Sequence, residues 1–136
     1  MLPVRHRIAD VLRPAETNTH QDHVIAHVIG ASVLGHFVWD ETAYLLLDIG
    51  FIWNIYLDGE MGLVPQTLGM TELRSETGED FETVTRLEPA PSPSPIQSVD
   101  FFETDDARRL VLNCEAGSVN LETSFENREI KVEYKE

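Results

Sequence analysis

The sequence is poor in basic residues and in cysteine. It has 10 Lys and Arg residues against 24 Asp and Glu, a formal net charge of −14, and one cysteine in 136 residues. Proteins bind nucleic-acid phosphates and anionic membrane surfaces largely through Lys and Arg, so this charge argues against both kinds of partner. A single cysteine cannot form an internal disulfide, so nothing in the sequence indicates an oxidising compartment.

Long apolar runs are also absent. The most apolar stretch, residues 43–57, is too short to span a bilayer and contains Asp48 and Asn54. The first residues carry charge but no apolar segment of signal-peptide length. The sequence therefore predicts a cytoplasmic protein that does not bind membranes. At 42% hydrophobic residues the chain is too apolar to be disordered, and its length fits one domain.

Residues 1–30 are predicted to be helical. Residues 3–13 can form a short helix that ends at Arg13-Pro14, because a residue before proline is displaced from the helical region. A second helix is predicted to begin at Thr19, which forms a capping box with Asp22, and to end at Gly30. The Val- and Ile-rich segment 23–29 is also compatible with a strand. The capping residues favour the helix.

Residues 31–65 are predicted to form a first β meander. From Leu45 to Leu57 every second residue is large and apolar, which is the period of a strand with one buried face. Gly50 is expected to divide this stretch, and Asp58-Gly59 predicts a hairpin turn.

The rest of the chain predicts a second meander. We expect a short helix over 66–75, a strand over 81–87, a Pro-rich connection over 88–95 and a β meander over 96–136. Phe37 and Leu46 match Phe101 and Leu110 at an offset of 64, which indicates either a duplication or two similar amphipathic hairpins. The expected fold is one α+β domain over 1–136. One or two short N-terminal helices would pack on a mostly antiparallel, strongly curved or barrel-like sheet of about seven to eight strands.

Three histidines form the first candidate site. His20, His23 and His27 would lie within about 60° of one another on the second helix. Imidazoles on successive turns can hold a transition metal such as zinc or iron, with Asp22 or His36 as a further ligand. No recognised metal motif completes the set, so we expect no cofactor. The alternative is three boundary histidines that bond to the backbone or to water.

The first predicted hairpin gives the second candidate site. A three-residue loop at Glu41-Thr42-Ala43 would pair Trp39 with Leu45 and keep the apolar face continuous. The same register would place His36 opposite Asp48. A two-residue loop would instead move His36 onto the apolar face, which is the less plausible arrangement for an imidazole.

The opposite, even-numbered face would then carry the residues of a ligand site. A His–Asp pair can transfer protons, and tyrosine and asparagine side chains can orient a small ligand in a pocket. The candidate ligand-binding residues are His36, Asp48, Tyr44, Asn54 and Tyr56. The alternative is a face that is solvated or covered by the helices.

Acidic residues dominate the first half of the chain. No Lys or Arg occurs between Arg13 and Arg74. An acidic surface either keeps a protein soluble or contacts a basic protein partner. The acidic residues of this segment are Glu16, Asp22, Asp40, Glu41, Asp48, Asp58, Glu60 and Glu72.

Two functions remain open from the sequence. The first is a non-catalytic interaction protein that binds a basic protein partner, or forms a homodimer through the region of Trp39, Phe51 and Trp53. The second is a small-ligand-binding or metal-dependent enzymatic module centred on His36 and Asp48 or on the three histidines. No phosphate-binding loop, nucleophile elbow or Cys-x-x-Cys pair occurs, which favours the non-catalytic function.

Overall fold

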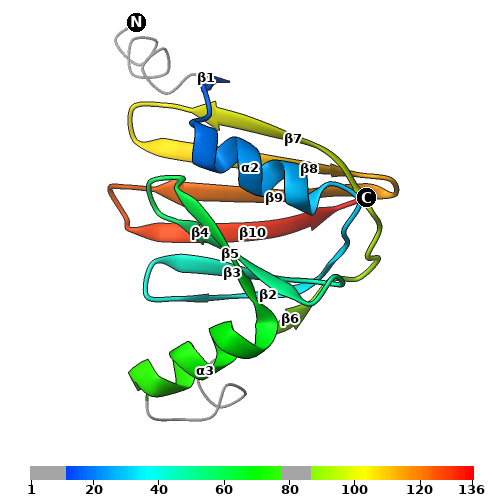
Figure 1. Cartoon of the computed structure of the whole chain (residues 1–136). Helices are drawn as coiled ribbons and strands as arrows, with labels where there is room; N and C mark the ends of the chain where they lie inside the picture. The colour runs from blue at the N-terminus through cyan, green and yellow to red at the C-terminus, as the bar shows by residue number, and fades with distance from the viewer. Residues whose placement is uncertain (1–11, 78–86) are drawn as a thin grey trace, which may run out of the picture.

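The computed structural model describes residues 12–77 and 87–136 of the chain (Figure 1). The predicted helix over 3–13 and the predicted strand over 81–87 lie almost entirely outside these ranges. Arg13, predicted to end that helix, instead begins a short strand. The elements in chain order are β1 (Arg13–Pro14), α2 (Thr19–Val28), β2 (Val33–Trp39), β3 (Thr42–Leu47), β4 (Phe51–Tyr56), β5 (Met61–Pro65), α3 (Gln66–Thr77), β6 (Glu88–Pro89), β7 (Ile96–Glu103), β8 (Ala107–Cys114), β9 (Gly117–Ser124) and β10 (Glu129–Lys135).

The strands form two five-stranded sheets in which every neighbouring pair is antiparallel. The first sheet has the order β5-β4-β3-β2-β6, and the second has the order β1-β7-β8-β9-β10. The predicted α+β class with mostly antiparallel strands is confirmed. The barrel-like sheet of seven to eight strands is wrong. Strand β6 takes the edge of β2 and α2 lies beside β5, so neither edge of the first sheet is left to pair with the second.

The two halves of the chain exchange short edge strands. Strand β1 precedes the first meander but pairs with β7 of the second, and β6 precedes the second meander but pairs with β2 of the first. The topology is thus repeated, but the sequence match at an offset of 64 does not follow it. Phe37 and Leu46 pack together on the outer face of the first sheet, whereas Phe101 and Leu110 belong to the core.

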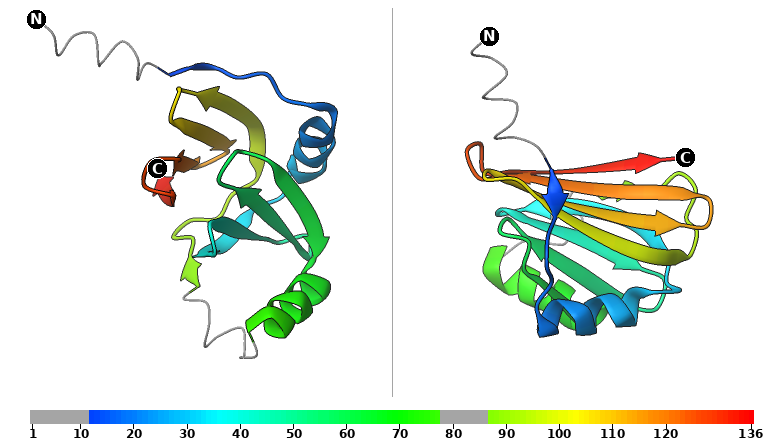
Figure 2. Two further views of the ribbon diagram at one scale, coloured as in Figure 1. Left: turned by 90° about the vertical axis from the view of Figure 1, so that its left-hand side faces the viewer. Right: turned by 90° about the horizontal axis from the view of Figure 1, so that it is seen from above.

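The hydrophobic core lies between the two sheets, which pack face to face in Figure 2. The predicted buried face of the first meander is confirmed within β3 and β4, where Leu45, Leu47, Trp53 and Ile55 are at most 2% exposed. It is wrong for Ile49, which lies in the turn between these strands and is 47% exposed. The second sheet contributes Leu110, Leu112, Val119, Leu121 and Ile130 to the same cluster.

Helix α2 closes one open side of this core. Val24 and Val28 point into the core cluster, and Gln21 Nε2 donates to Gly59 O at 3.0 Å. The helix begins where the sequence predicted, but its N-cap is Asn18 rather than Thr19, and its capping box joins Asn18 with Gln21. The asparagine side chain accepts a hydrogen bond from a free N–H group of the first turn, so Asn18 is the cap and Thr19 is the first helical residue.

The turns predicted at Gly50 and at Asp58-Gly59 are present. Gly50 and Gly59 both adopt left-handed conformations, with φ of 81° and 88°. The loop around Gly59 has three residues rather than two, because Tyr56 pairs with Glu60 and its N–H donates to Glu60 O at 2.8 Å. Asn54 consequently pairs with Gly62, whereas a two-residue turn at Asp58-Gly59 would pair it with Leu63.

The outer faces of the two sheets differ. Helix α3, which confirms the helix predicted over 66–75, packs on the outer face of the first sheet. A Cβ at Gly69 would lie 3.1 Å from Ile52 and 3.2 Å from Val64. Neither α2 nor α3 covers the outer face of the second sheet (Figure 2). Within the described residues no helix has the length and apolarity needed to cross a membrane.

Candidate functional site

The first hairpin has a different register from the predicted one, and this moves His36. Asp40 and Glu41 form a two-residue turn with φ of 48° and 62°, and Trp39 pairs with Thr42. Consecutive left-handed residues match the twist of a hairpin, so the two-residue turn is favoured here over a three-residue loop. His36 therefore pairs with Leu45, and the predicted pairing with Asp48 is wrong.

His36 lies on the inner face of the first sheet. A bulge between Val33 and Gly35 shifts the alternation of β2, so that both Val33 and His36 face the interior. The His36 side chain is almost fully buried. Its Nδ1 lies 2.6 Å from Tyr134 Oη, on β10 of the second sheet, and its Nε2 lies 3.7 Å from Glu88 Oε2, on β6.

Burial sets the protonation of this His36–Tyr134 pair. It lowers the pKa of His36, an effect that Glu88 opposes, so the imidazole is neutral at pH 7. Burial, assisted by Glu88, raises the pKa of Tyr134 to about 12. We assign the imidazole proton to Nε2, which faces the Glu88 carboxylate, so that Nδ1 accepts the Tyr134 hydroxyl. The pair thus joins the two sheets through a hydrogen bond.

Asp48 has a separate role in the turn between β3 and β4. Its carboxylate accepts from Ser32 N at 2.9 Å, and its own N–H donates to Ser32 O at 3.0 Å. It stabilises the start of β2.

Tyr44, Asn54 and Tyr56 share the outer face of the first sheet, away from His36. Tyr44 stacks on Phe37 with ring centroids 4.6 Å apart and pairs across the sheet with Asn54. Asn54 Oδ1 is buried and has no hydrogen-bond partner among the described residues, whereas Tyr56 is 42% exposed. The five predicted ligand-binding residues are therefore divided among the sheet interior, a turn and the outer face.

The histidines of α2 lie along the first sheet's edge. His20 Nε2 lies 3.0 Å from the carbonyl oxygen of Met61, so this imidazole forms a hydrogen bond with the backbone at the edge of β5. All three histidine residues are exposed. Across residues 12–77 and 87–136, no three His, Cys, Asp or Glu side chains approach closely enough to hold a metal ion.

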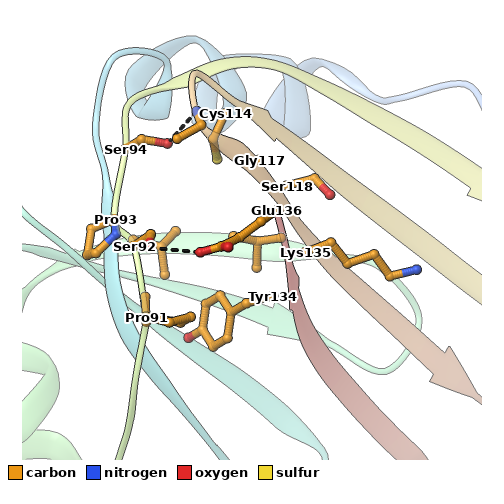
Figure 3. Close-up of a pocket in the computed structure, with 14 residues that line it drawn as sticks. Pro91, Ser92, Pro93, Ser94, Cys114, Gly117, Ser118, Tyr134, Lys135 and Glu136 are labelled. Atoms are coloured by element: carbon orange, nitrogen blue, oxygen red, sulfur yellow. Dashed lines mark hydrogen bonds between the residues drawn. The ribbon is translucent and has the colours of Figure 1, made fainter.

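A small hollow lies beside Tyr134, between the Pro-rich connection and the turn from β8 to β9 (Figure 3). Ser94 Oγ accepts from Ala116 N at 3.0 Å, and Ser92 Oγ donates to Glu136 at 2.9 Å. Burial raises the pKa of the Cys114 thiol, which also lines the hollow and so is a poor nucleophile. The free space is about 30 Å³, enough for one water molecule.

Four hairpin turns meet at the end of the molecule opposite this hollow, on the left of Figure 1. A side hollow of about 490 Å³ at this end is lined by residues of both sheets. We call this end of the molecule, where the four turns meet, the acidic end. Its turns carry Asp40, Glu41, Asp58, Glu60, Asp105, Asp106 and Glu126.

The cations of the acidic end are already paired. Arg128 Nε donates to Glu41 at 2.6 Å and ties the first sheet to the second. Arg13 lies 3.3 Å from Asp105, and Arg108 lies 3.6 Å from Glu103. In contrast, Asp40, Asp58, Glu60, Asp106 and Glu126 form no ion pair with any described residue.

Several structurally important residues were not found from the sequence. Tyr134 and Glu88 contact His36 across 98 and 52 positions of the chain, and Arg128 contacts Glu41 across 87. No local pattern marks such pairs. Comparisons with protein-family models, curated proteins and solved structures found no match for this chain.

Proposed function

We propose that this protein is a non-catalytic binding module whose acidic end contacts a basic protein partner. The supporting observation is that four turns, two from each sheet, bring unpaired carboxylates to one end of the molecule. Concentrated charge of one sign attracts and orients an oppositely charged partner during encounter.

Carboxylates from both halves of the chain contribute to the acidic end. Asp40, Asp58 and Glu60 come from the segment between Arg13 and Arg74, which has no Lys or Arg, and the turns of the second sheet add Asp106 and Glu126. The arginines nearby are held by other carboxylates, so they leave most of this charge uncompensated.

The alternative function, a ligand-binding or metal-dependent module, has less support. Pockets for small molecules usually measure about 300–1,000 Å³, far more than the space beside Tyr134. His36 is buried between the sheets, its partner Tyr134 is half-buried, and His36 does not pair with Asp48. We therefore assign these residues to the stability of the fold.

A charge-matched comparison tests the proposal. Asp40→Asn/Asp58→Asn removes two carboxylates from the acidic end and keeps residues that suit these turns. Glu115→Gln/Glu136→Gln removes two exposed carboxylates from the opposite end. Proteins captured on the immobilised wild-type chain are identified, and the affinity of each purified basic partner is measured for all three chains.

We expect binding to the acidic-end variant to weaken, and binding by the wild type to weaken further between low and physiological salt. The control variant should bind like the wild type. Equal losses in both variants, or an affinity insensitive to salt, would contradict the proposal.

A further inference from the structure

The outer face of the second sheet carries rows of side chains that no described helix covers (Figure 2). Register places Phe102, Arg109, Glu122 and Lys131 in one row across β7 to β10, and Asp100, Val111, Asn120 and Glu133 in the next. Helix α3 covers the equivalent face of the first sheet. In the described ranges, no helix lies over this one (Figure 2).

This face is hollowed and has an apolar centre. A groove of about 460 Å³ runs over it, and the half-buried side chains of Phe102, Val111 and Asn120 form its middle. The exposed Lys131 and Glu133 lie at the edge strand β10, and Asp100 lies on the far side. The groove thus combines apolar side chains, Phe102 and Val111, with charged ones, a mixture that protein–protein interfaces also have.

The charge of the face favours a second copy of this chain as its partner. Lys131 and Lys135 are the only lysines in the sequence, and both lie here with Arg109. Four carboxylates, Asp100, Glu122, Glu129 and Glu133, lie on the same face, so these side chains sum to a charge of only −1 in a chain of net charge −14. Two copies repel one another least when they approach through these faces.

The charges are also self-complementary. Arg109 Nε and Nη2 donate to Glu122 Oε2 at 3.1 and 2.6 Å, from neighbouring strands at the centre of the sheet. A two-fold axis parallel to the strands and between β8 and β9 would place β8 over β9 of the second copy. Arg109 would then face Glu122 of the second copy, and Val111 would face its Asn120.

We propose that the protein forms a two-fold symmetric homodimer through the outer faces of its second sheets. This interface is separate from the acidic end, so a basic partner and a second copy can bind at the same time. It replaces the predicted dimer surface at Trp39, Phe51 and Trp53, because Trp53 is 0% exposed and belongs to the core. Closed two-fold dimers are the commonest assemblies of identical chains.

The first test measures the mass of the full chain by sedimentation velocity and light scattering. We expect a dimer for the wild type and a monomer for Val111→Asp, which places two carboxylates in the apolar centre of the interface. The matched control, Ile49→Asp, alters a 47% exposed residue in the turn between β3 and β4 and should remain dimeric. Circular dichroism checks that both variants are folded.

The second test exchanges charges. Arg109→Glu alone and Glu122→Arg alone should each dimerise at least about tenfold more weakly, since like charges then meet across the axis. An equimolar mixture of the two variants should form a heterodimer, because each cross-axis pair regains opposite charges. Within each variant chain, residues 109 and 122 carry like charges before and after mixing. Recovery of dimerisation would therefore come from contacts between the chains.

Three results would overturn the proposal. A wild type that stays monomeric at high micromolar concentration excludes the dimer, even if another protein binds the groove. A dimer that survives Val111→Asp uses a different surface. Two charge variants that remain monomeric when mixed exclude the two-fold pairing of Arg109 with Glu122.

Discussion

The imidazole of His36 and the hydroxyl of Tyr134 form a 2.6 Å hydrogen bond between strands of different sheets, 98 positions apart in the sequence. The His36 side chain is 7% exposed. His36 is buried and Tyr134 is half-buried, and without the Tyr134 hydroxyl the imidazole Nδ1 would have no hydrogen-bond partner among the described residues. The bond thus fixes how the two meanders are aligned.

Removal of the Tyr134 hydroxyl should therefore destabilise the fold. In Tyr134→Phe the ring remains but His36 Nδ1 loses its partner, which costs about 1–3 kcal/mol for a buried polar group. Urea unfolding measures the loss. Tyr56→Phe, at a 42% exposed position, is the control and should change the free energy of unfolding by less than about 0.5 kcal/mol. Equal effects of the two substitutions would show that the buried bond contributes nothing.

Stability should fall as the pH falls below the ordinary pKa of histidine. Burial lowers the pKa of His36, so the unfolded chain takes up a proton from about pH 6.5 downward while the folded chain does not. Unfolding is then favoured progressively until the pH reaches the folded-state pKa. His36→Gln should flatten this part of the stability profile, measured by thermal unfolding between about pH 7 and 5. A profile with the same slope in the variant would assign the effect to other groups.

Tyr134 predicts a second loss of stability in alkali. Its pKa is about 12 in the folded protein, against 10.0 for an ordinary tyrosine. Between these values the unfolded chain releases a proton that the folded chain retains, so stability falls as the pH rises through this window. Absorbance of tyrosinate should show one residue that titrates late, and Tyr134→Phe should remove it.

Gly59 and Gly50 should respond differently to alanine. Both have positive φ, which costs an L-residue about 1–2 kcal/mol. At Gly59 a Cβ would also lie 2.6 Å from Phe101 Cζ, whereas at Gly50 nothing lies within 4 Å. Gly59→Ala should therefore lose about 1–3 kcal/mol more than Gly50→Ala in urea unfolding. Similar losses would mean that Phe101 moves aside freely.

The three histidines of α2 should contribute unequally to stability. His20→Ala removes the contact with the Met61 carbonyl and should cost about 0.5–1.5 kcal/mol. His23 and His27 are as exposed as His20 but make no such contact with a described residue, so His23→Ala and His27→Ala serve as controls, each within about 0.5 kcal/mol of the wild type. The measurement is thermal unfolding in the presence of a chelator, repeated with added zinc. A zinc-dependent rise in melting temperature that all three substitutions abolish would restore the metal site.

The sequence by itself determined most of the secondary structure. Alternation at Leu45, Leu47, Trp53 and Ile55 has the period of a strand, and these residues do form the buried face. Glycines at positions 50 and 59 marked turns because they readily adopt positive φ. These features depend on neighbouring residues only, so a local pattern was sufficient to predict them.

Only the tertiary structure decided the register and the candidate site. A change of one residue in a turn shifts the pairing of its two strands by one and so reverses the face of one strand relative to the other. The two-residue turn at Asp40 and Glu41 thus pairs His36 with the buried Leu45. The bulge at the start of β2 has the same kind of effect. The partner of His36 on β10, and the meeting of four turns at the acidic end, depend on how two sheets pack. Such long-range contacts follow from the free energy of the whole fold and leave no periodicity in the sequence.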